Sequence, residues 1–407
     1  MEMGRFSDLS EEEFVKTHLK YRPSSEKVRE VNSQIHEAVA AASLGTSDDE
    51  SYDDLPASFS WTEPQPGFGK VVTPVHNQQD ICASCWAFVS ADSIAGRYAV
   101  LSKRDVEEMS VKQIMVCDHE DNGCNTGNMY TAYDWIGENG GLSTRKDYDS
   151  IVPGEVQDDE AARCAPEAKL SLTTPGMCDL KMTAGNRALM VAIKESGPVA
   201  IGINANNLQF YESGIIDAAS CPPAGRGIQS INHAAIVVGW GEENGKKYWL
   251  VKNSYGEDFG ENGYFRLERE RPNMDTLFGT CGLLFESVYP VVTEAGVELG
   301  EPELQCTEGS VFKKDYYRNE DDNPGASLQA MAEADAAVGA ALGRIVATAS
   351  LGSARTKTKT MPSESATSAT MMKGASVLVA GAGVAVLVAR RRRGAWGGDS
   401  EHTPLLP

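Results

Sequence analysis

The sequence predicts an α+β protein that carries a C-terminal membrane anchor. Residues 85–165 have helical character, for example in the run Tyr130–Ile136, whereas Pro198–Ile203 and Ala234–Trp240 are apolar, strand-like runs. Helices therefore come first and strands later, an order typical of α+β folds. Near the C-terminus, the uncharged block 374–389 precedes four arginines, which is the pattern expected where a membrane-spanning helix ends.

The composition is that of a globular protein in an oxidising compartment. The chain has 407 residues, of which 41% are hydrophobic, enough for a substantial core. Its formal net charge of −21 argues against a nucleic-acid partner and fits an acidic working environment, although an acidic solvated surface explains the charge equally well. Nine cysteines favour an oxidising lumen. We expect neither a metal ion nor a cofactor.

Residues 1–54 precede the main domain. Ser10 and Glu13 have the spacing of a capping box, which predicts a short helix that begins after Ser10. The polar stretch Ser47–Asp54 is a candidate site of proteolytic cleavage near Asp54 or Leu55, although it fits a solvated loop as well.

Three residues far apart in the sequence form a candidate catalytic set. Cys85 begins an apolar helical run, and a helix N-terminus favours thiolate over thiol. His233 directly precedes an apolar strand, and Asn253 lies further along. Each residue alone fits a structural role. Together they match the order of a nucleophilic cysteine with a histidine about 150 residues downstream, followed by an asparagine.

The run Gln79–Phe88, which contains Cys-Ala-Ser-Cys-Trp, resembles the catalytic loop of papain-like cysteine peptidases, most closely their cathepsin L-like branch. The resemblance covers roughly residues 55–290. Further matching landmarks are Leu55–Trp61, Val72–Gln78, Gly123–Gly127, Asn262–Arg266, Cys281-Gly282 and Tyr289-Pro290. The resemblance implies a papain-like fold with two subdomains, a helical left half that carries Cys85 and a β-barrel-like right half that carries His233 and Asn253. Substrate would bind in the cleft between them.

The resemblance also implies the chemistry. His233 would take the proton of Cys85 to give a thiolate–imidazolium pair, Asn253 would orient the imidazole, and the Gln79 side chain would stabilise the oxyanion. The implied activity is endoproteolysis of peptide and protein substrates by a monomer. Residues 1–54 resemble the end of an inhibitory propeptide, and the family's longer prosegment and a signal peptide would precede Met1.

Departures from the family pattern leave an alternative open. Asp80, Ile81 and Ala83 replace small residues, and a positive φ at Asp80 or Ala83 would strain the loop. Tyr255 and Phe259 stand where the family has tryptophans. The alternative is a membrane-tethered pseudoenzyme or binding protein that keeps the fold and has lost turnover.

Six residues align with substrate-binding positions of the family. Gly127 would offer its backbone to the substrate, and the others would line the S2 pocket: Met129, Gly202, Ile231, Ala234 and Glu286. Most are apolar or small, so we expect bulky hydrophobic P2 residues. Glu286 at the pocket floor would also accept arginine, unless its side chain points to solvent.

The resemblance implies three disulfides, Cys82–Cys124, Cys117–Cys164 and Cys221–Cys281, and leaves Cys85 as the free thiol. Cys178 and Cys306 remain unassigned. They could pair with each other, or Cys178 could pair with Cys117, because the sequence does not determine connectivity.

After Pro290, residues 291–370 are rich in Ala, Ser and Thr and are interpreted as a stalk. Residues 371–389 form the predicted transmembrane helix. Its 374–389 block spans about 24 Å as a helix, and flanking residues would supply the remainder. A soluble core helix or a lipid-anchor signal explains the following arginines less well. The basic tail 390–407 would be cytosolic, with an acidic dileucine-like motif at Glu401–Leu406 for sorting adaptors. We therefore expect a type I membrane protein with a lumenal catalytic domain in lysosomes or endosomes.

Overall fold

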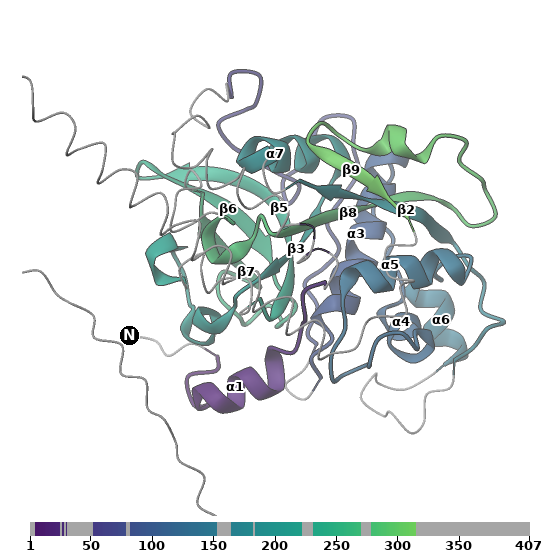
Figure 1. Cartoon of the computed structure of the whole chain (residues 1–407), viewed down its shortest axis with the longest axis horizontal. Helices are drawn as coiled ribbons and strands as arrows, with labels where there is room; N and C mark the ends of the chain where they lie inside the picture. The colour runs from purple at the N-terminus through teal and green to yellow at the C-terminus, as the bar shows by residue number, and fades with distance from the viewer. Residues whose placement is uncertain are drawn as a thin grey trace, which may run out of the picture. The chain divides into compact units, whose positions relative to one another are not determined.

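The computed structural model describes residues 5–24, 27, 30, 52–78, 82–152, 164–181, 184–221, 231–269 and 278–314 (Figure 1). All of them belong to one compact unit, Met1–Arg355. The predicted oxyanion residue Gln79, the transmembrane helix 371–389 and the tail 390–407 lie outside the described residues. Within the described ranges, no helix is long and apolar enough to cross a membrane.

The helical part is built around α3 (Cys85–Ser102), which is buried along most of its length and on more than one face. Such a helix belongs in the interior of a protein. Three shorter helices accompany it, and each begins at a side chain that accepts a backbone N–H: Ser110, Asn128 and Thr144. These helices are α4 (Val111–Cys117), α5 (Met129–Glu138) and α6 (Arg145–Ile151).

The strands form one mixed sheet in the order β4-β7-β6-β5-β3-β8-β2-β9, with β1 paired to β5. Helix α7 (Gly185–Ser196) packs on β5 and β3. The predicted strand runs correspond to β3 and β5, whose residues are almost all buried. The strands are β1 (Phe59–Ser60), β2 (Leu172–Leu180), β3 (Val199–Ile203), β4 (Ile215–Ile216), β5 (His233–Glu243), β6 (Lys246–Lys252), β7 (Tyr264–Glu268), β8 (Glu286–Glu294) and β9 (Ser310–Lys313). Short 3-10 helices are η3 (Asn206–Phe210), η4 (Ala218–Ser220), η6 (Thr280–Gly282) and η7 (Pro302–Gln305).

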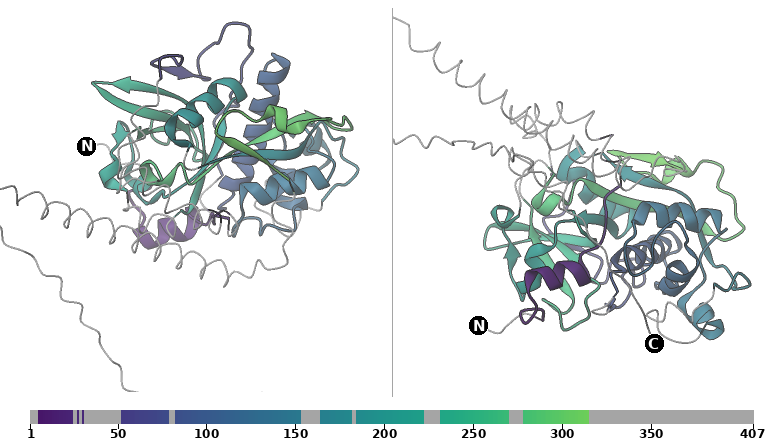
Figure 2. Two further views of the ribbon diagram at one scale, coloured as in Figure 1. Left: turned by 45° about the horizontal axis from the view of Figure 1, so that its top comes forward. Right: turned by 60° about the horizontal axis from the view of Figure 1, so that its bottom comes forward.

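Helices precede most strands in the chain, so the predicted α+β class is confirmed. Helices α3 and α5 connect the two parts, because α3 packs on β5 and β8 and α5 packs on β2 (Figures 1 and 2). The first residue of α3 and the first residue of β5 are thereby brought to the same region of the molecule.

The four disulfides include the three predicted pairs, Cys82–Cys124, Cys117–Cys164 and Cys221–Cys281. The fourth joins Cys178 to Cys306, so the alternative pairing of Cys178 with Cys117 is wrong. Cys85 is free, as predicted.

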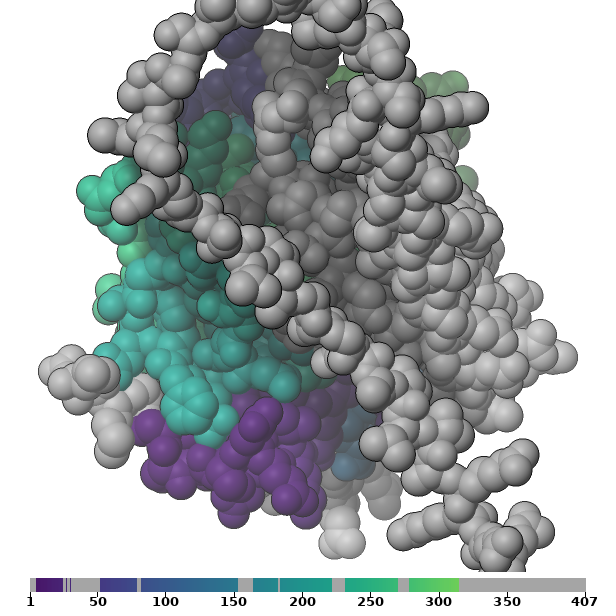
Figure 3. Space-filling view, turned by 60° about the vertical axis from the view of Figure 1, so that its left-hand side comes forward, coloured from purple at the N-terminus to yellow at the C-terminus, as the bar shows by residue number. Residues whose placement is uncertain are grey.

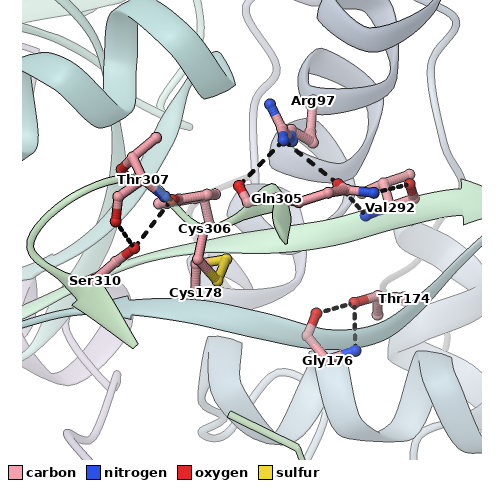
Figure 4. Close-up of a disulfide and its surroundings, with 10 residues drawn as sticks. Arg97, Thr174, Gly176, Cys178, Val292, Gln305, Cys306, Thr307 and Ser310 are labelled. Atoms are coloured by element: carbon pink, nitrogen blue, oxygen red, sulfur yellow. Dashed lines mark hydrogen bonds between the residues drawn. A yellow bond between two sulfur atoms is a disulfide. The ribbon is translucent and has the colours of Figure 1, made fainter. Parts of the chain in front are cut away.

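The predicted start of the stalk at residue 291 is wrong, because the folded part of the chain continues beyond it. Residues 291–294 complete β8, and the following segment folds back over the sheet through η7 and β9. We call residues 295–314 the C-terminal strap. Its strand β9 pairs with β2, the Cys178–Cys306 disulfide ties it to that strand, and Arg97 of α3 donates to Gln305 (Figure 4).

The N-terminal segment (described residues 5–24, Lys27 and Glu30) begins with α1 (Glu11–His18). The predicted capping box is confirmed, because Ser10 accepts from the Glu13 N–H and the Glu13 carboxylate accepts from the Ser10 N–H. Helix α1 lies against the sheet-rich part (Figure 3), and the chain then runs between the two parts of the unit (Figure 1).

Candidate active site

Cys85, His233 and Asn253 are brought together in the interior. Cys85 is the first residue of α3, His233 the first of β5, and Asn253 directly follows β6. All three are buried. The backbone amide of Ala234, the neighbour of His233, donates to the Cys85 thiol. The thiol therefore lies beside the start of the strand that carries the histidine.

The imidazole of His233 has a defined tautomer. Its Nε2 lies 2.8 Å from Asn253 Oδ1, and the N–H of Ser254 donates to the same oxygen at 2.9 Å. Because Oδ1 accepts from Ser254, Nε2 must carry the proton and Nδ1 is left as the acceptor in the neutral ring. The Tyr255 hydroxyl lies 3.3 Å from Nδ1, and its ring packs against the imidazole at a centroid distance of 4.9 Å. Tyr255 therefore provides an aromatic cover for the imidazole and adds a hydroxyl next to Nδ1.

Burial determines the protonation of this pair. It raises the pKa of the Cys85 thiol to about 12, although backbone amides, first that of Ala234, lower it. Burial also lowers the pKa of His233 to about 4, although the hydrogen bond that Nε2 donates to Asn253 raises it. With the N-terminal segment in place, both pKa shifts favour a neutral thiol and a neutral imidazole. The thiolate–imidazolium pair expected during catalysis stays a prediction.

The structure draws attention to Gln78, a residue that the sequence analysis did not assign. Its side chain is buried, and Ser254 Oγ donates to its Oε1 at 2.7 Å. Its backbone N–H donates to the Ser254 carbonyl at 2.8 Å, so both ends of the residue are held beside Asn253. Its Nε2 is a buried donor with no partner among the described residues. The sequence signal that could have identified Gln78 is its position after Asn77 at the end of the landmark 72–78, just before the loop that leads to Cys85.

The loop before Cys85 shows no strain at Ala83. The described residues with positive φ other than glycine are Lys103, Asn244, Asn262 and Cys281, so the condition under which Ala83 would strain the loop is not met. Asp80 and Ile81 lie outside the described residues.

The residues predicted to bind substrate converge. Met129, Ile231 and Ala234 share one buried apolar cluster with Cys85. Gly202 of β3 is paired with Ala234 on one side and Glu286 on the other, and a Cβ on Gly202 would lie 2.7 Å from the Glu286 carboxylate. Glu286 is fully buried and does not point to solvent.

Gly127 lies directly on the indole of Trp86. A Cβ at this position would lie 2.3 Å from the Trp86 ring, so only glycine allows the backbone to approach this closely. The close approach leaves the Gly127 backbone beside the helix that carries Cys85.

The N-terminal segment fills this site. Tyr21 belongs to the same apolar cluster, its hydroxyl donates to Glu286 at 2.8 Å, and the Ser24 N–H donates to Glu286 at 2.6 Å. Burial raises the pKa of Glu286 to about 7, although the bonds from Ser24 and Tyr21 lower it. Glu286 therefore contacts two polar groups of the N-terminal segment.

Both sides of the cleft hold the segment by its backbone. Thr126 Oγ1 donates to the Lys20 carbonyl at 2.7 Å, and Asn128 Nδ2 donates to the Arg22 carbonyl at 2.7 Å. From the opposite side, the Asn232 carbonyl accepts from the Tyr21 N–H at 3.1 Å. These bonds use backbone groups and would accept any extended peptide.

Helix α1 covers the dyad. The rings of Phe6, Phe14 and His18 each pack against Tyr255, with His18 at a centroid distance of 5.6 Å. Since Tyr255 lies on the imidazole of His233, this aromatic cluster excludes water from the nucleophile.

The chain is similar in sequence to known proteases. Residues 55–291 match the family described as papain family cysteine protease. The chain is 30% identical to digestive cysteine proteinase 3 of Homarus americanus, over 71% of this chain and 79% of that protein. It is 31% identical to procathepsin L of Mus musculus, over 72% and 78%.

Solved structures of protease precursors have a similar fold. Recombinant stem bromelain precursor gives a TM-score of 0.52 at 25% identity, over 71% of this chain and 82% of that chain. Digestive procathepsin L 3 of Tenebrio molitor gives 0.50 at 26%, over 71% and 81%. With its buried Cys85 beside a histidine that asparagine orients, the chain belongs to the papain family of cysteine proteases and is a cysteine-type peptidase.

Proposed function

We propose that the chain is an endopeptidase precursor in which Cys85 is the nucleophile, His233 the base and Asn253 the orienter. The observation that carries this is the fixed tautomer of His233, which leaves Nδ1 as the proton acceptor. Once water and substrate replace the N-terminal segment, His233 takes the thiol proton, and the thiolate attacks the peptide carbonyl. Acyl-enzyme formation and hydrolysis follow, with His233 returning the proton to the leaving amine.

We propose Gln78, in place of the predicted Gln79, as the side-chain donor to the oxyanion. Its Nε2 is buried and has no partner among the described residues, while Ser254 holds the opposite end of its amide. A preorganised donor of this kind stabilises the charge that develops in the transition state.

Residues 5–30 are proposed to act as an inhibitory prosegment. The backbone bonds from Thr126, Asn128 and Asn232 and the seating of Tyr21 against Glu286 support this. The pocket would accept bulky apolar P2 residues and, through Glu286, arginine.

The four disulfides support an oxidising, lumenal location. A transmembrane helix at 371–389, a cytosolic tail that binds sorting adaptors, and residence in lysosomes or endosomes remain proposals that rest on the sequence.

A single labelling experiment tests the proposed activity against the pseudoenzyme alternative that the changed loop 80–83 motivates. The chain, processed to remove the N-terminal segment, is treated at about pH 5.5 with an epoxysuccinyl thiol inhibitor and mapped by mass spectrometry. We expect stoichiometric labelling of Cys85 and none in Cys85→Ala. Absence of labelling at Cys85 would favour the pseudoenzyme.

A further inference from the structure

Lys27 of the N-terminal segment lies in a buried acidic site that the catalytic residues do not use. Its Nζ donates to both carboxylate oxygens of Asp179, at 2.8 and 2.7 Å, and to the Leu180 carbonyl at 3.2 Å. Each of the two side chains is only 2% exposed. Tyr130 donates its hydroxyl to Asp179 at 2.8 Å. The ammonium group is therefore fully coordinated by groups of the catalytic domain.

This site adjoins the Glu286 pocket. The Ser24 N–H donates to Glu286, and the Lys27 N–H donates to Ser24 Oγ at 3.0 Å, so a single turn of the segment connects the two carboxylates. Lys27 and Asp179 both lie close enough to Glu286 to influence its charge. A peptide in the cleft can therefore reach Asp179 when it also reaches Glu286.

The C-terminal strap builds the outer side of this site. Asp179 pairs with Val288 of β8 and with Val311 of β9, and the Cys178–Cys306 disulfide is adjacent to it in the chain (Figure 4). The family match ends at residue 291, so β9 lies beyond it. Lys313 of β9 also lies 3.3 Å from Glu30 of the segment.

Removal of the segment would leave Asp179 with Tyr130 as its donor and without its cation. A buried carboxylate without a counter-charge is costly, and Glu286 is a second carboxylate nearby. The Asp179 carboxylate and the Leu180 carbonyl would then be acceptors that have lost their ammonium donor, which favours a basic side chain over an apolar one at this position.

We propose that Asp179, the Tyr130 hydroxyl and the Leu180 carbonyl form a subsite for a basic side chain, which Lys27 occupies in the precursor and a substrate lysine or arginine occupies in the processed enzyme. Asp179 would thus determine specificity, in addition to Glu286. This inference rests on the proposed peptidase function, and its substrate class is peptides that carry a basic residue in addition to the residue that fills the Glu286 pocket.

The test uses the processed chain and a set of reporter peptides. The parent peptide has phenylalanine at P2 and norleucine at the other varied positions, and lysine replaces norleucine one position at a time. We expect one position at which lysine raises kcat/KM about tenfold. Asp179→Asn should abolish that gain, while Glu303→Gln, which removes an exposed carboxylate of the strap, should keep both the gain and the parent rate.

No lysine preference in the wild type, or a preference that survives in Asp179→Asn, would overturn the subsite. If the wild type cleaves no peptide, including the parent, the proposed function fails instead. A second measurement does not need turnover: thermal unfolding of the unprocessed chain in a Lys27→Met, Asp179→Asn double-mutant cycle. We expect Lys27→Met to lower Tm and Asp179→Asn to restore much of the loss. Additive effects would contradict the site.

Discussion

The two ends of the cleft respond differently to the same covering segment. At the dyad, aromatic rings of α1 exclude water, and no described group of the segment supplies an opposite charge to Cys85 or His233. At the acidic end, the segment supplies hydrogen bonds to Glu286 and an ammonium group to Asp179. The segment thus covers the dyad with aromatic rings that exclude water. In the specificity pocket it supplies hydrogen-bond donors and a positive charge to the carboxylates.

Because of this difference, a fall in pH changes the docking of the segment in opposite directions at the two ends of the cleft. The lowered pKa of His233 means that its contribution to docking is complete above about pH 6.5 and is lost as the pH falls toward 4. The raised pKa of Glu286 means that its contribution is complete below about pH 4.5 and is lost as the pH rises through 7. Acid therefore weakens the segment at the dyad and strengthens it at the pocket.

The largest expected effect is at the dyad. Cys85→Ala should lower kcat/KM on a reporter peptide by about 10⁵-fold or more, because it removes the free thiol that lies beside the start of the strand carrying His233. Thermal unfolding of the unprocessed variant should remain close to that of the wild type. Residual turnover within tenfold of the wild type would remove Cys85 from the mechanism.

A smaller effect distinguishes the two glutamines. Gln78→Ala should lower kcat about 10²- to 10³-fold with little change in KM, since its Nε2 would act only on the transition state. Gln79→Ala serves as the matched control and should change kcat by less than about threefold. The reverse pattern would restore the assignment that the sequence predicts.

At the acidic end, Glu286→Gln should lower the ratio of kcat/KM for P2 arginine to P2 phenylalanine about tenfold at pH 7.5. In the wild type this ratio should rise from pH 5 to pH 8 as the carboxylate ionises, and in the variant it should be flat. Negligible cleavage of arginine peptides at every pH would show that Glu286 does not select for arginine.

The opposite acid responses can be separated in the unprocessed chain, with Cys85→Ala present to prevent self-cleavage. Adding Glu286→Gln removes the contribution that strengthens docking in acid and leaves that of His233. Tm should therefore fall more steeply between pH 6.5 and 4.5 than in Cys85→Ala alone. Parallel curves would show that Glu286 does not titrate in this range.

The smallest effect concerns the hydroxyl on the imidazole. Tyr255→Phe removes the group 3.3 Å from His233 Nδ1 and should change kcat/KM about two- to fivefold, with a shift in the acid limb of its pH profile. Tyr255→Trp keeps an aromatic cover and provides the comparison. An unchanged profile in Tyr255→Phe would limit the residue to packing.

Several parts of the structure were predictable from local sequence. The capping box at Ser10 depends on neighbouring residues, and Cys85, His233 and Asn253 stand in a family order that resemblance reveals. Other parts depend on long-range packing. The pairing of β9 with β2 has no local signal, so the strap was interpreted as a stalk. Gln78 was missed because its role depends on Ser254, a residue far along the chain, and not on its distance from Cys85.

The same limit of prediction from local sequence applies to the Glu286 pocket. Resemblance grouped Glu286 with Gly202, which it pairs with in the sheet, and its role in substrate binding stays a prediction. The lysine near it belongs to a segment whose position in the cleft no local pattern encodes. Burial and its effect on protonation likewise emerge only when both sides of the cleft and the covering segment are assembled.

The Cys178–Cys306 bond bears on the fate of the chain after self-digestion. A single cut anywhere from Asp179 to Gln305 would leave two polypeptides that stay covalently joined. Such nicked molecules would migrate as one species on a non-reducing gel and separate only after reduction. Whatever follows Lys314 would accordingly remain attached through nicks in this stretch and would be released by scission after Cys306.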